Sequence, residues 1–397
     1  MAKFIVKKIT ENRIKAGEKL INVDDLEDGQ GSHLLSEGSR IDLVDQEGNF
    51  LAKLLVGRQN KGLGWIFTNQ RDHKFSQAWI QDLLNHAIDE RFSSFDLQET
   101  NAFRLFNGEG DGLGGVTIDY YAGYLQINWY SKGVYGYREW FMEGLVNSEI
   151  EFEGIYETLR FDFYDDQDPI QLRWGNPAPQ PLIIKENGLN FAIYLGQEWM
   201  TGLFLDQREV RKFILEQGQG ESLLNLFSYT GAFSLVGAKS GILKTVSVDV
   251  ANRSLERTKE QFQINQVDLS SDNHEIRVMD VFDYIKYAHR HDIRFDWVIC
   301  DPPSYARTKK FVFSAEKDYL SLAEDLFTMT KPGGMTIIST NHSGYPASKF
   351  RQDMVEVGRN HPGQFQLIQS FGLPLDFPTS LDESSQYLKV LVFYRSI

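Results

Sequence analysis

Apolar residues along the chain follow two different periods, and their positions predict alternating strands and helices in the carboxyl-terminal half. Mainly apolar runs at 223–227 and 295–300 are typical of buried parallel strands, and 245–248 and 276–278 are expected to be two further strands. Between 223–227 and 245–248, residues 232–238 keep the helical spacing of apolar side chains, and Gly241 ends the pattern. The chain therefore predicts an α/β fold with a parallel sheet, organised around a βαβ unit at 223–249.

The amino-terminal part follows another pattern, in which short alternating segments near 4–6, 40–44, 50–56 and 65–67 are separated by glycine-rich breaks. This predicts a small β-barrel or sandwich over residues 1–75. Residues 76–100 keep a helical period, and the strands after them complete a small α+β domain over 76–180. We interpret the polar, proline-containing residues 165–180 as a linker or exposed loop, so the third domain spans 181–397.

The turn that follows the strand at 223–227 predicts a ligand site. It reads Ser228-Tyr229-Thr230-Gly231, and the next strand ends in Asp249. A glycine at this place lets the backbone pass close to a ligand, and a carboxylate at the tip of the second strand can accept the hydroxyls of a ribose. The turn has one glycine instead of the three of G-x-G-x-x-G, which favours a nucleoside without phosphates, such as S-adenosylmethionine (SAM). The alternative is a generic α/β turn with a solvated Asp249.

A second candidate site follows the apolar run at 295–300, which leads directly into Asp301-Pro302-Pro303-Ser304-Tyr305. Two prolines cannot continue a central strand, so the chain must leave the sheet there. Asp301 is then expected at the carboxyl edge of the sheet, where open α/β sheets bind their ligands. A DPP corner with an aromatic residue, placed after a ribose-binding acid, is typical of class I methyltransferases.

In three further stretches, polar residues could either contact a ligand or have a structural role. Gln207 belongs to TGLFLDQR and either caps a helix or contacts the methionine end of a cofactor. Asp280, followed by Val281, either accepts from an adenine amino group or caps the next helix, and the two roles are compatible. The glycine-dense GEGDGLGG at 108–115 could cradle phosphate, but its two acids favour a structural loop.

Composition narrows the class of protein. The formal net charge of −14 argues against binding phosphates over the whole surface, whereas residues 1–75 carry 12 Lys and Arg against 11 Asp and Glu. RNA would therefore be repelled least at the amino end. A single cysteine, Cys300, excludes an intrachain disulfide and fits a reducing cytoplasm. No apolar stretch is long enough to span a bilayer, no signal peptide is recognised and no metal site is predicted.

Several motifs together resemble the family of 23S ribosomal RNA large-subunit methyltransferases that modify cytosine at C5. They are GEGDGLGGVTIDYY, KENGLNF, TGLFLDQRE, NLFSYTGAFS, VSVD, DPPSY and KPGG, and EGSRIDLVDQEGNFLAK resembles the PUA-type RNA-binding barrel of its amino end. Another kind of small β module is the alternative there. The resemblance implies a PUA domain, a small α+β insert and a Rossmann-like seven-stranded core that uses SAM on RNA, specifically ribosomal RNA. Catalytic roles are predicted for Asp301 and Tyr305; cofactor contacts are predicted for Gln207, Phe227, Ser228, Tyr229, Thr230, Gly231, Asp249, Asp280, Val281 and Asp301.

The chain departs from that family at one position. The family carries Ser-Cys-Ser after the KPGG strand, and its cysteine attacks C6 of the cytosine to make C5 nucleophilic. Here the stretch reads Ser339-Thr340-Asn341-His342-Ser343, and we expect Cys300 to be an inert core residue. Direct transfer to a base amine or ring nitrogen needs no thiol, and His342 could then be either a base or a loop residue.

The sequence leaves three hypotheses. The first is a cytoplasmic SAM-dependent RNA methyltransferase. The second is a catalytically inactive RNA-binding protein of the same fold, and the third is a nicotinamide-dependent oxidoreductase, which the single-glycine turn disfavours. The target nucleotide, the methylated atom and the oligomeric state stay open, and a homodimer is compatible with the sequence.

Overall fold

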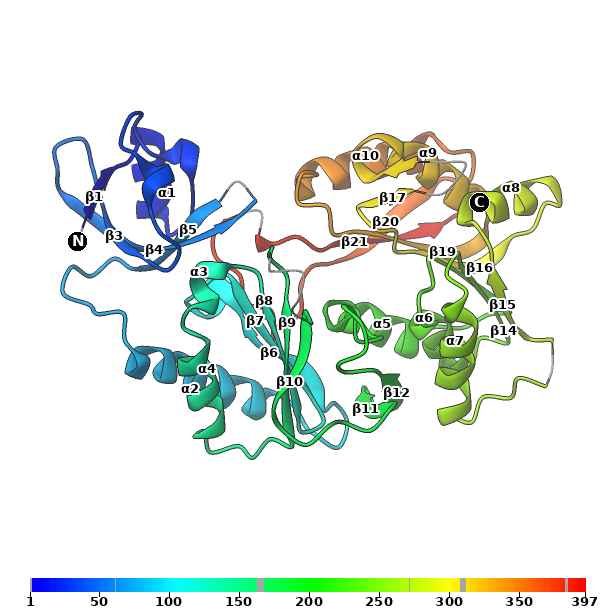
Figure 1. Cartoon of the computed structure of the whole chain (residues 1–397). Coiled ribbons are helices and arrows are strands. Elements are labelled where there is room, and N and C mark those ends of the chain that lie inside the picture. Colours follow the sequence, from blue (N-terminus) through cyan, green and yellow to red (C-terminus); the bar gives the residue numbers. More distant parts are fainter. Residues whose placement is uncertain (1, 61, 163–167, 271, 308–311, 383–384) are drawn as a thin grey trace. The chain divides into compact units, whose positions relative to one another are not determined.

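The structure is a computed structural model, and it describes residues 2–60, 62–162, 168–270, 272–307, 312–382 and 385–397 (Figure 1). The chain forms two compact units. Unit 1 contains residues 1–188, 193–201 and 375–385, and unit 2 contains residues 189–192, 202–374 and 386–397. The units are described separately below. No helix in the described part of the chain combines the length and apolar character needed to cross a bilayer.

Unit 2 is built on the predicted seven-stranded sheet, in the order β15-β14-β13-β16-β19-β21-β20. The first five strands of this order are parallel, and β21 runs antiparallel to both of its neighbours. The bounds are β13 Ser222–Leu226, β14 Lys244–Asp249, β15 His274–Val278, β16 Phe295–Cys300, β19 Thr330–Thr340, β20 Phe365–Phe371 and β21 Lys389–Arg395. The predicted Rossmann-like α/β core is therefore confirmed.

Helices cover both faces of this sheet, α5 to α7 on one face and α8 to α10 on the other (Figure 1). Their bounds are α5 Arg208–Gln217, α6 Ala232–Ser240, α7 Arg253–Ile264, α8 Val281–Arg290, α9 Ala315–Thr328 and α10 Ala347–Asn360. The 3-10 turn η4 (Leu205–Gln207) leads into α5, and β17 (Tyr305–Arg307) pairs with β18 (Val312–Ser314). Apolar side chains of the central strands and of α8 to α10 are buried together in one continuous core.

The amino-terminal part of unit 1 is a five-stranded sheet in the order β1-β3-β4-β5-β2. Its elements are β1 Ala2–Ile5, α1 Lys8–Ala16, β2 Leu20–Asn22, η1 Val23–Asp25, η2 Ser32–Leu34, β3 Arg40–Val44, β4 Phe50–Gln59 and β5 Gly62–Thr68. The alternating segments predicted β1, β3, β4 and β5. The helix α1 was missed because its sequence, KITENRIKA, is mostly polar.

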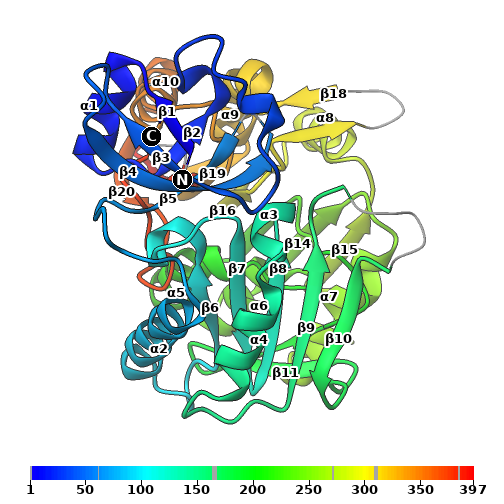
Figure 2. The ribbon, with the colours of Figure 1, turned by 60° about the vertical axis from the view of Figure 1, so that its left-hand side comes forward.

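The second part of unit 1 is a five-stranded sheet in the order β10-β9-β8-β7-β6, with an apolar core between it and the helices α2 and α4 (Figure 2). The bounds are α2 Gln77–Ser94, β6 Ala102–Asn107, η3 Gly108–Asp111, β7 Val116–Tyr121, β8 Tyr124–Trp129, α3 Lys132–Tyr135, α4 Arg138–Val146, β9 Gly154–Leu159, β10 Ile170–Gly175 and β11 Leu182–Glu186. The strand β12 (Leu189–Ile193) pairs with β11, and its residues 189–192 belong to unit 2. The interpretation of 165–180 as a linker was wrong for 170–175, because β10 pairs there with β9. Residues 163–167 lie outside the described residues.

The glycine-dense loop at 108–115 is structural, as predicted. Asp111 accepts two hydrogen bonds from the buried Arg91 guanidinium, at 2.8 and 2.7 Å, and one from the backbone of Asn107. Glu109 accepts from Ser380, which lies in the returning segment 375–385 of the same unit. Both acids therefore help to hold the loop, which favours the structural interpretation.

Candidate active site

The register of the parallel strands gathers the predicted site residues at one edge of the unit 2 sheet. Leu226 of β13 pairs with Val248 of β14 on one side and with Cys300 of β16 on the other. Cys300 in turn pairs with Ile338 of β19. The residues that come next along each strand therefore meet at the carboxyl edge: Phe227, Asp249, Asp301 and Ser339. Topologically, this is the edge at which open α/β sheets bind ligands.

The turn between β13 and α6 has an unusual backbone. Phe227 and Tyr229, both bulky, adopt left-handed conformations with φ of 57° and 51°, and Gly231 has φ of 77°. Left-handed backbone is rare for such side chains and occurs preferentially at functional sites. A Cβ on Gly231 would lie 2.4 Å from Thr258 Cγ2 of α7. Close packing of α6 against α7 is therefore sufficient reason for this glycine, independent of any ligand.

Asp249 organises the turn as well as facing the edge. Its Oδ2 accepts from the backbone N–H of Tyr229 at 2.9 Å, and its Oδ1 accepts from that of Ala251 at 2.8 Å. Two carboxylate oxygens offer about four lone-pair positions. Half-buried Asp249 can therefore still accept a pair of vicinal hydroxyls while it holds the loop in place.

Asp301 lies at the end of β16 and is held by two side chains. Ser339 of β19 donates a hydrogen bond to its Oδ1, and the Gln207 amide donates another. Burial raises the pKa of Asp301 to about 6, and repulsion from Asp206 adds to this, whereas the two hydrogen bonds and Arg211 oppose it. Asp301 is therefore an ionised, weakly basic carboxylate near neutral pH, suited to accept a proton or to offset a positive charge.

The corner after Asp301 presents an aromatic ring to solvent. Pro302 is buried, while Tyr305, the first residue of β17, has 59% of its surface exposed. Ser304 donates to Asn341 Oδ1 at 2.6 Å, which joins the corner to the loop after β19. An exposed ring four residues from a carboxylate can stack with a nucleobase.

Asp280 is the N-cap of α8. Its carboxylate accepts from the backbone N–H of Phe282 at 2.9 Å and from that of Asp283 at 3.4 Å, and buried Val281 begins the helix. The capping interpretation is confirmed. The backbone N–H of Met279 donates to the carbonyl of Asp249, so Asp280, the next residue, lies near the same edge of the sheet as Asp249. The predicted contact of Asp280 with adenine is compatible with this position.

Replacing Asp280 by alanine should lower the free energy of unfolding by about 1 kcal/mol, because two N–H groups at the start of α8 lose their acceptor. Urea unfolding monitored by circular dichroism measures this. The matched Asp280→Ser variant keeps a capping oxygen and should lose less than half as much. Equal losses in both variants would contradict the capping role.

Comparison with known proteins decides the class. Residues 160–394 match the family model of S-adenosylmethionine-dependent methyltransferases, and residues 4–69 match that of PUA-like domains. The chain belongs to the S-adenosylmethionine-dependent methyltransferases. This confirms the predicted family, fold class and cofactor, and it excludes the nicotinamide-dependent oxidoreductase.

Three relatives of this methyltransferase illustrate the match. YwbD of Bacillus subtilis, provisionally named a ribosomal RNA large subunit methyltransferase, is 44% identical over 402 residues and covers 100% of both chains. Ribosomal RNA large subunit methyltransferase I of Yersinia pseudotuberculosis is 29% identical and covers 86% of both. The crystal structure of SMU.776 with SAH, provisionally described as a methyltransferase, is 35% identical, has a TM-score of 0.90 and covers 99% of this chain and 100% of that one.

The carboxyl edge of this methyltransferase has polar atoms that fit SAM. Ser228 Oγ and Gln207 Oε1 are buried, with residue exposures of 6% and 3%, and neither has a hydrogen-bond partner within the described residues. Leaving such groups unpaired is costly, so a ligand that pairs them is favoured. The hydroxyl can donate to a carboxylate and the amide oxygen can accept from an ammonium, which are the two charged groups of the methionine part of SAM. When bound there, SAM supplies the methyl group.

Cys300 cannot act in this site. Its side chain is fully buried in the core of unit 2, and burial raises the pKa of its thiol well above the usual value. The expectation of a core residue is confirmed. His342 is half-buried, and its ring lies over Gly344; the buried Lys389 ammonium donates to its carbonyl at 2.7 Å. These contacts order the loop at 342–345, and a catalytic part for His342 stays untested.

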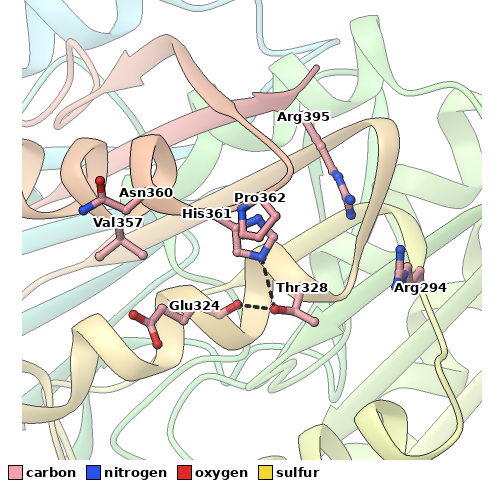
Figure 3. A pocket seen from close by; sticks show the side chains of 8 residues that line it. All are labelled: Arg294, Glu324, Thr328, Val357, Asn360, His361, Pro362 and Arg395. Atoms are coloured by element: carbon pink, nitrogen blue, oxygen red, sulfur yellow. Dashed lines mark hydrogen bonds between the residues drawn. The ribbon is translucent and has the colours of Figure 1, made fainter. Parts of the chain in front are cut away.

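A cavity of about 500 Å³ lies elsewhere in unit 2 (Figure 3). It is lined by Arg294, Glu324, Thr328, Val357, Asn360, His361, Pro362 and Arg395. Arg294 precedes β16 and Thr328 precedes β19, so this cavity is at the amino ends of the parallel strands. The carboxyl edge with Asp249 and Asp301 is at the other ends, and the cavity is a separate feature.

Sequence reasoning missed Ser339, which contacts Asp301, and Tyr319, which contacts Ser339. Ser339 donates to the Asp301 carboxylate, and the hydroxyl of the fully buried Tyr319 in α9 donates to the carbonyl of Ser339. A signal for Ser339 was present: it follows an apolar strand, and aligning that strand with 295–300 places it beside Asp301. No sequence signal identified Tyr319, since its contact depends on how α9 packs against β19.

Proposed function

We propose that this methyltransferase transfers a methyl group from SAM to a base of ribosomal RNA of the large ribosomal subunit. Full-length similarity to YwbD, including the PUA-like part, is the observation that carries the proposal. The name of the Yersinia relative points to the same substrate. PUA-like modules serve RNA binding, and the near-neutral charge of residues 1–75 makes this part of an acidic chain the least repelled by phosphate.

Roles for the individual side chains are part of this proposal. Asp249 would accept the ribose hydroxyls, and Asp280 with Val281 would border the adenine. Gln207 and the turn Phe227, Ser228, Tyr229, Thr230 and Gly231 would hold the methionine part. Asp301 would face the reacting methyl group and Tyr305 would stack on the target base. Support comes from their placement at one edge and from the unpaired atoms of Ser228 and Gln207.

The roles of the three predicted domains are also part of this proposal. Residues 1–75 would bind RNA, 76–180 would form a small α+β domain and 181–397 would carry out the transfer. A cytoplasmic location follows from a substrate that is ribosomal RNA, and a homodimer stays a prediction. Within the described residues no cluster of three or more His, Cys, Asp or Glu could hold a metal ion.

Mass mapping of ribosomal RNA from cells with and without the protein tests the function. We expect one methyl group in large-subunit RNA to be present only when the protein is present. Purified protein with SAM should restore it on RNA from the deficient cells. An unchanged map together with no transfer in vitro would favour the alternative, a catalytically inactive RNA-binding protein of this fold. Methyl transfer to transfer RNA alone would contradict the ribosomal substrate.

A further inference from the structure

The described side chains of the edge bear on which atom of the base is methylated. A pyrimidine C5 becomes nucleophilic only after an enzyme group has added to C6, and a thiolate is the usual group. The chain has one cysteine, Cys300, whose exposure is 0%. It points into the core formed with α8 to α10 and cannot reach a base at the edge without disrupting that core.

Three hydroxyl groups close to Asp301 in the described structure take part in other contacts. Ser339, with 2% exposure, donates to the Asp301 carboxylate, and Ser304 donates to Asn341. Thr340 is fully buried and accepts from the backbone N–H of His342 at 3.2 Å. None of these three hydroxyls is both exposed and free of other contacts. We therefore do not expect any of them to add to C6 of a pyrimidine in place of a thiol.

The groups that do lie at this edge are suited to methylation of a nitrogen atom of the base. The Asp301 carboxylate is an acceptor with a negative charge, fixed in direction by Ser339 and Gln207. A base nitrogen that takes up a methyl group becomes more positive, and a preorganised carboxylate stabilises that charge. Amino and ring N–H groups of a base can donate to the same carboxylate. The exposed ring of Tyr305 can stack on a base that has been flipped out of the RNA helix. Methylation of a ribose hydroxyl would not require such a stacking surface.

Resting on the proposed function, we propose that the methyl group goes to a nitrogen of the RNA base, directly and without a covalent bond between protein and RNA. The lone pair of the nitrogen forms the new N–C bond while the bond between sulfur and the methyl carbon breaks, and the electron pair of that bond stays on sulfur. A proton carried by the nitrogen passes to Asp301. Where the nitrogen carries no proton, the positive charge stays on the base and the carboxylate offsets it.

Nucleoside analysis of the product tests the proposal. Ribosomal RNA from cells that lack the protein is methylated in vitro with tritiated SAM, digested to nucleosides and analysed by chromatography and mass spectrometry. The label should be on a base nitrogen. Label on C5 of a pyrimidine or on ribose would overturn the proposal and leave the proposed function intact. Absence of label from all ribosomal RNA would instead contradict the proposed function.

Two further measurements test the direct step. RNA containing 5-fluorocytidine traps enzymes that add a nucleophile to C6, so we expect no complex with the unaltered protein that survives a denaturing gel; such a complex would overturn the proposal. Cys300→Ala should keep the initial rate within about threefold, because the thiol takes no part. A loss of activity in a variant with unchanged circular dichroism and SAM affinity would count against the proposal; if the variant does not fold, the 5-fluorocytidine experiment on the unaltered protein decides.

Discussion

Replacing Asp301 by asparagine should lower kcat by about 10²- to 10⁴-fold, the range for a positioned acid–base group. Asparagine keeps the shape and an oxygen that can accept from Ser339, but it removes the negative charge that opposes the positive charge of the transition state. The dissociation constant of SAM should change much less than kcat, because asparagine keeps the shape of the predicted cofactor contact and loses only the charge that acts on the reacting group. Single-turnover kinetics with saturating SAM separate the two effects.

Asp292→Asn is the matched control for this variant. Its carboxylate is 81% exposed and lies in the connection between α8 and β16, at the amino end of β16. The same change of one charge should there leave kcat within about twofold. A loss of kcat below tenfold in Asp301→Asn would remove Asp301 from the chemical step.

The dependence of the rate on pH gives an independent test of the same carboxylate. The pKa of Asp301 is raised to about 6 by burial, so the ionised form that accepts a proton or offsets charge is depleted below that pH. The rate should therefore fall about tenfold for each pH unit below 6 and level off above it. This acidic limb should be missing from Asp301→Asn.

Replacing Asp111 by alanine should lower the free energy of unfolding by about 3–5 kcal/mol, because the buried Arg91 charge loses its buried partner and keeps only the half-exposed Glu90. The side chains of Asp111 and Arg91 are only 5% and 4% exposed, and they form two hydrogen bonds. The backbone N–H of Asn107 loses its acceptor as well. Urea unfolding measures the difference, and we expect the loop at 108–115 to become accessible to proteases.

Glu90→Ala is the control that separates the effect of a buried ion pair from that of an exposed one. Glu90 binds the same Arg91 guanidinium at 2.7 Å, but its side chain is 52% exposed. An exposed ion pair of this kind contributes about 1 kcal/mol or less. Similar losses for Glu90→Ala and Asp111→Ala would show that the stability does not come from the buried pair.

Much of the candidate site could be predicted from where the apolar strands end in the sequence. Asp249 and Asp301 each follow an apolar run, and parallel strands share a carboxyl edge, so their meeting was predictable without coordinates. Gly231 was predicted to let the backbone pass close to a ligand, while its close contact with Thr258 of α7 could be found only in the packed structure. The Asn187-Gly188 turn between β11 and β12 has both residues at positive φ, the conformation for which an Asn-Gly pair is the usual sequence signal.

Contacts between distant parts of the chain could not be predicted. Asp376 accepts from the backbone N–H of Arg104, 272 residues earlier, and Phe377 lies under the Arg104 guanidinium at 4.4 Å. Nothing in the local pattern of 375–385 indicates that it packs on unit 1 while its flanks belong to unit 2. β10 was missed for another reason: Ile170, Leu172 and Trp174 do alternate with polar residues, but the polar, proline-containing residues around them outweighed that short signal, and pairing with β9 defines the strand.

The central claim is that the edge around Asp249 binds SAM through its sugar. Titration calorimetry of SAM with the unaltered protein, Asp249→Asn and Asp249→Ala tests it most directly. Loss of hydrogen bonds to a charged acceptor costs about 1.5–3 kcal/mol, so Asp249→Ala should raise the dissociation constant by about 10- to 100-fold, with Asp249→Asn between it and the unaltered protein. Equal affinity for SAM in all three proteins would contradict the account.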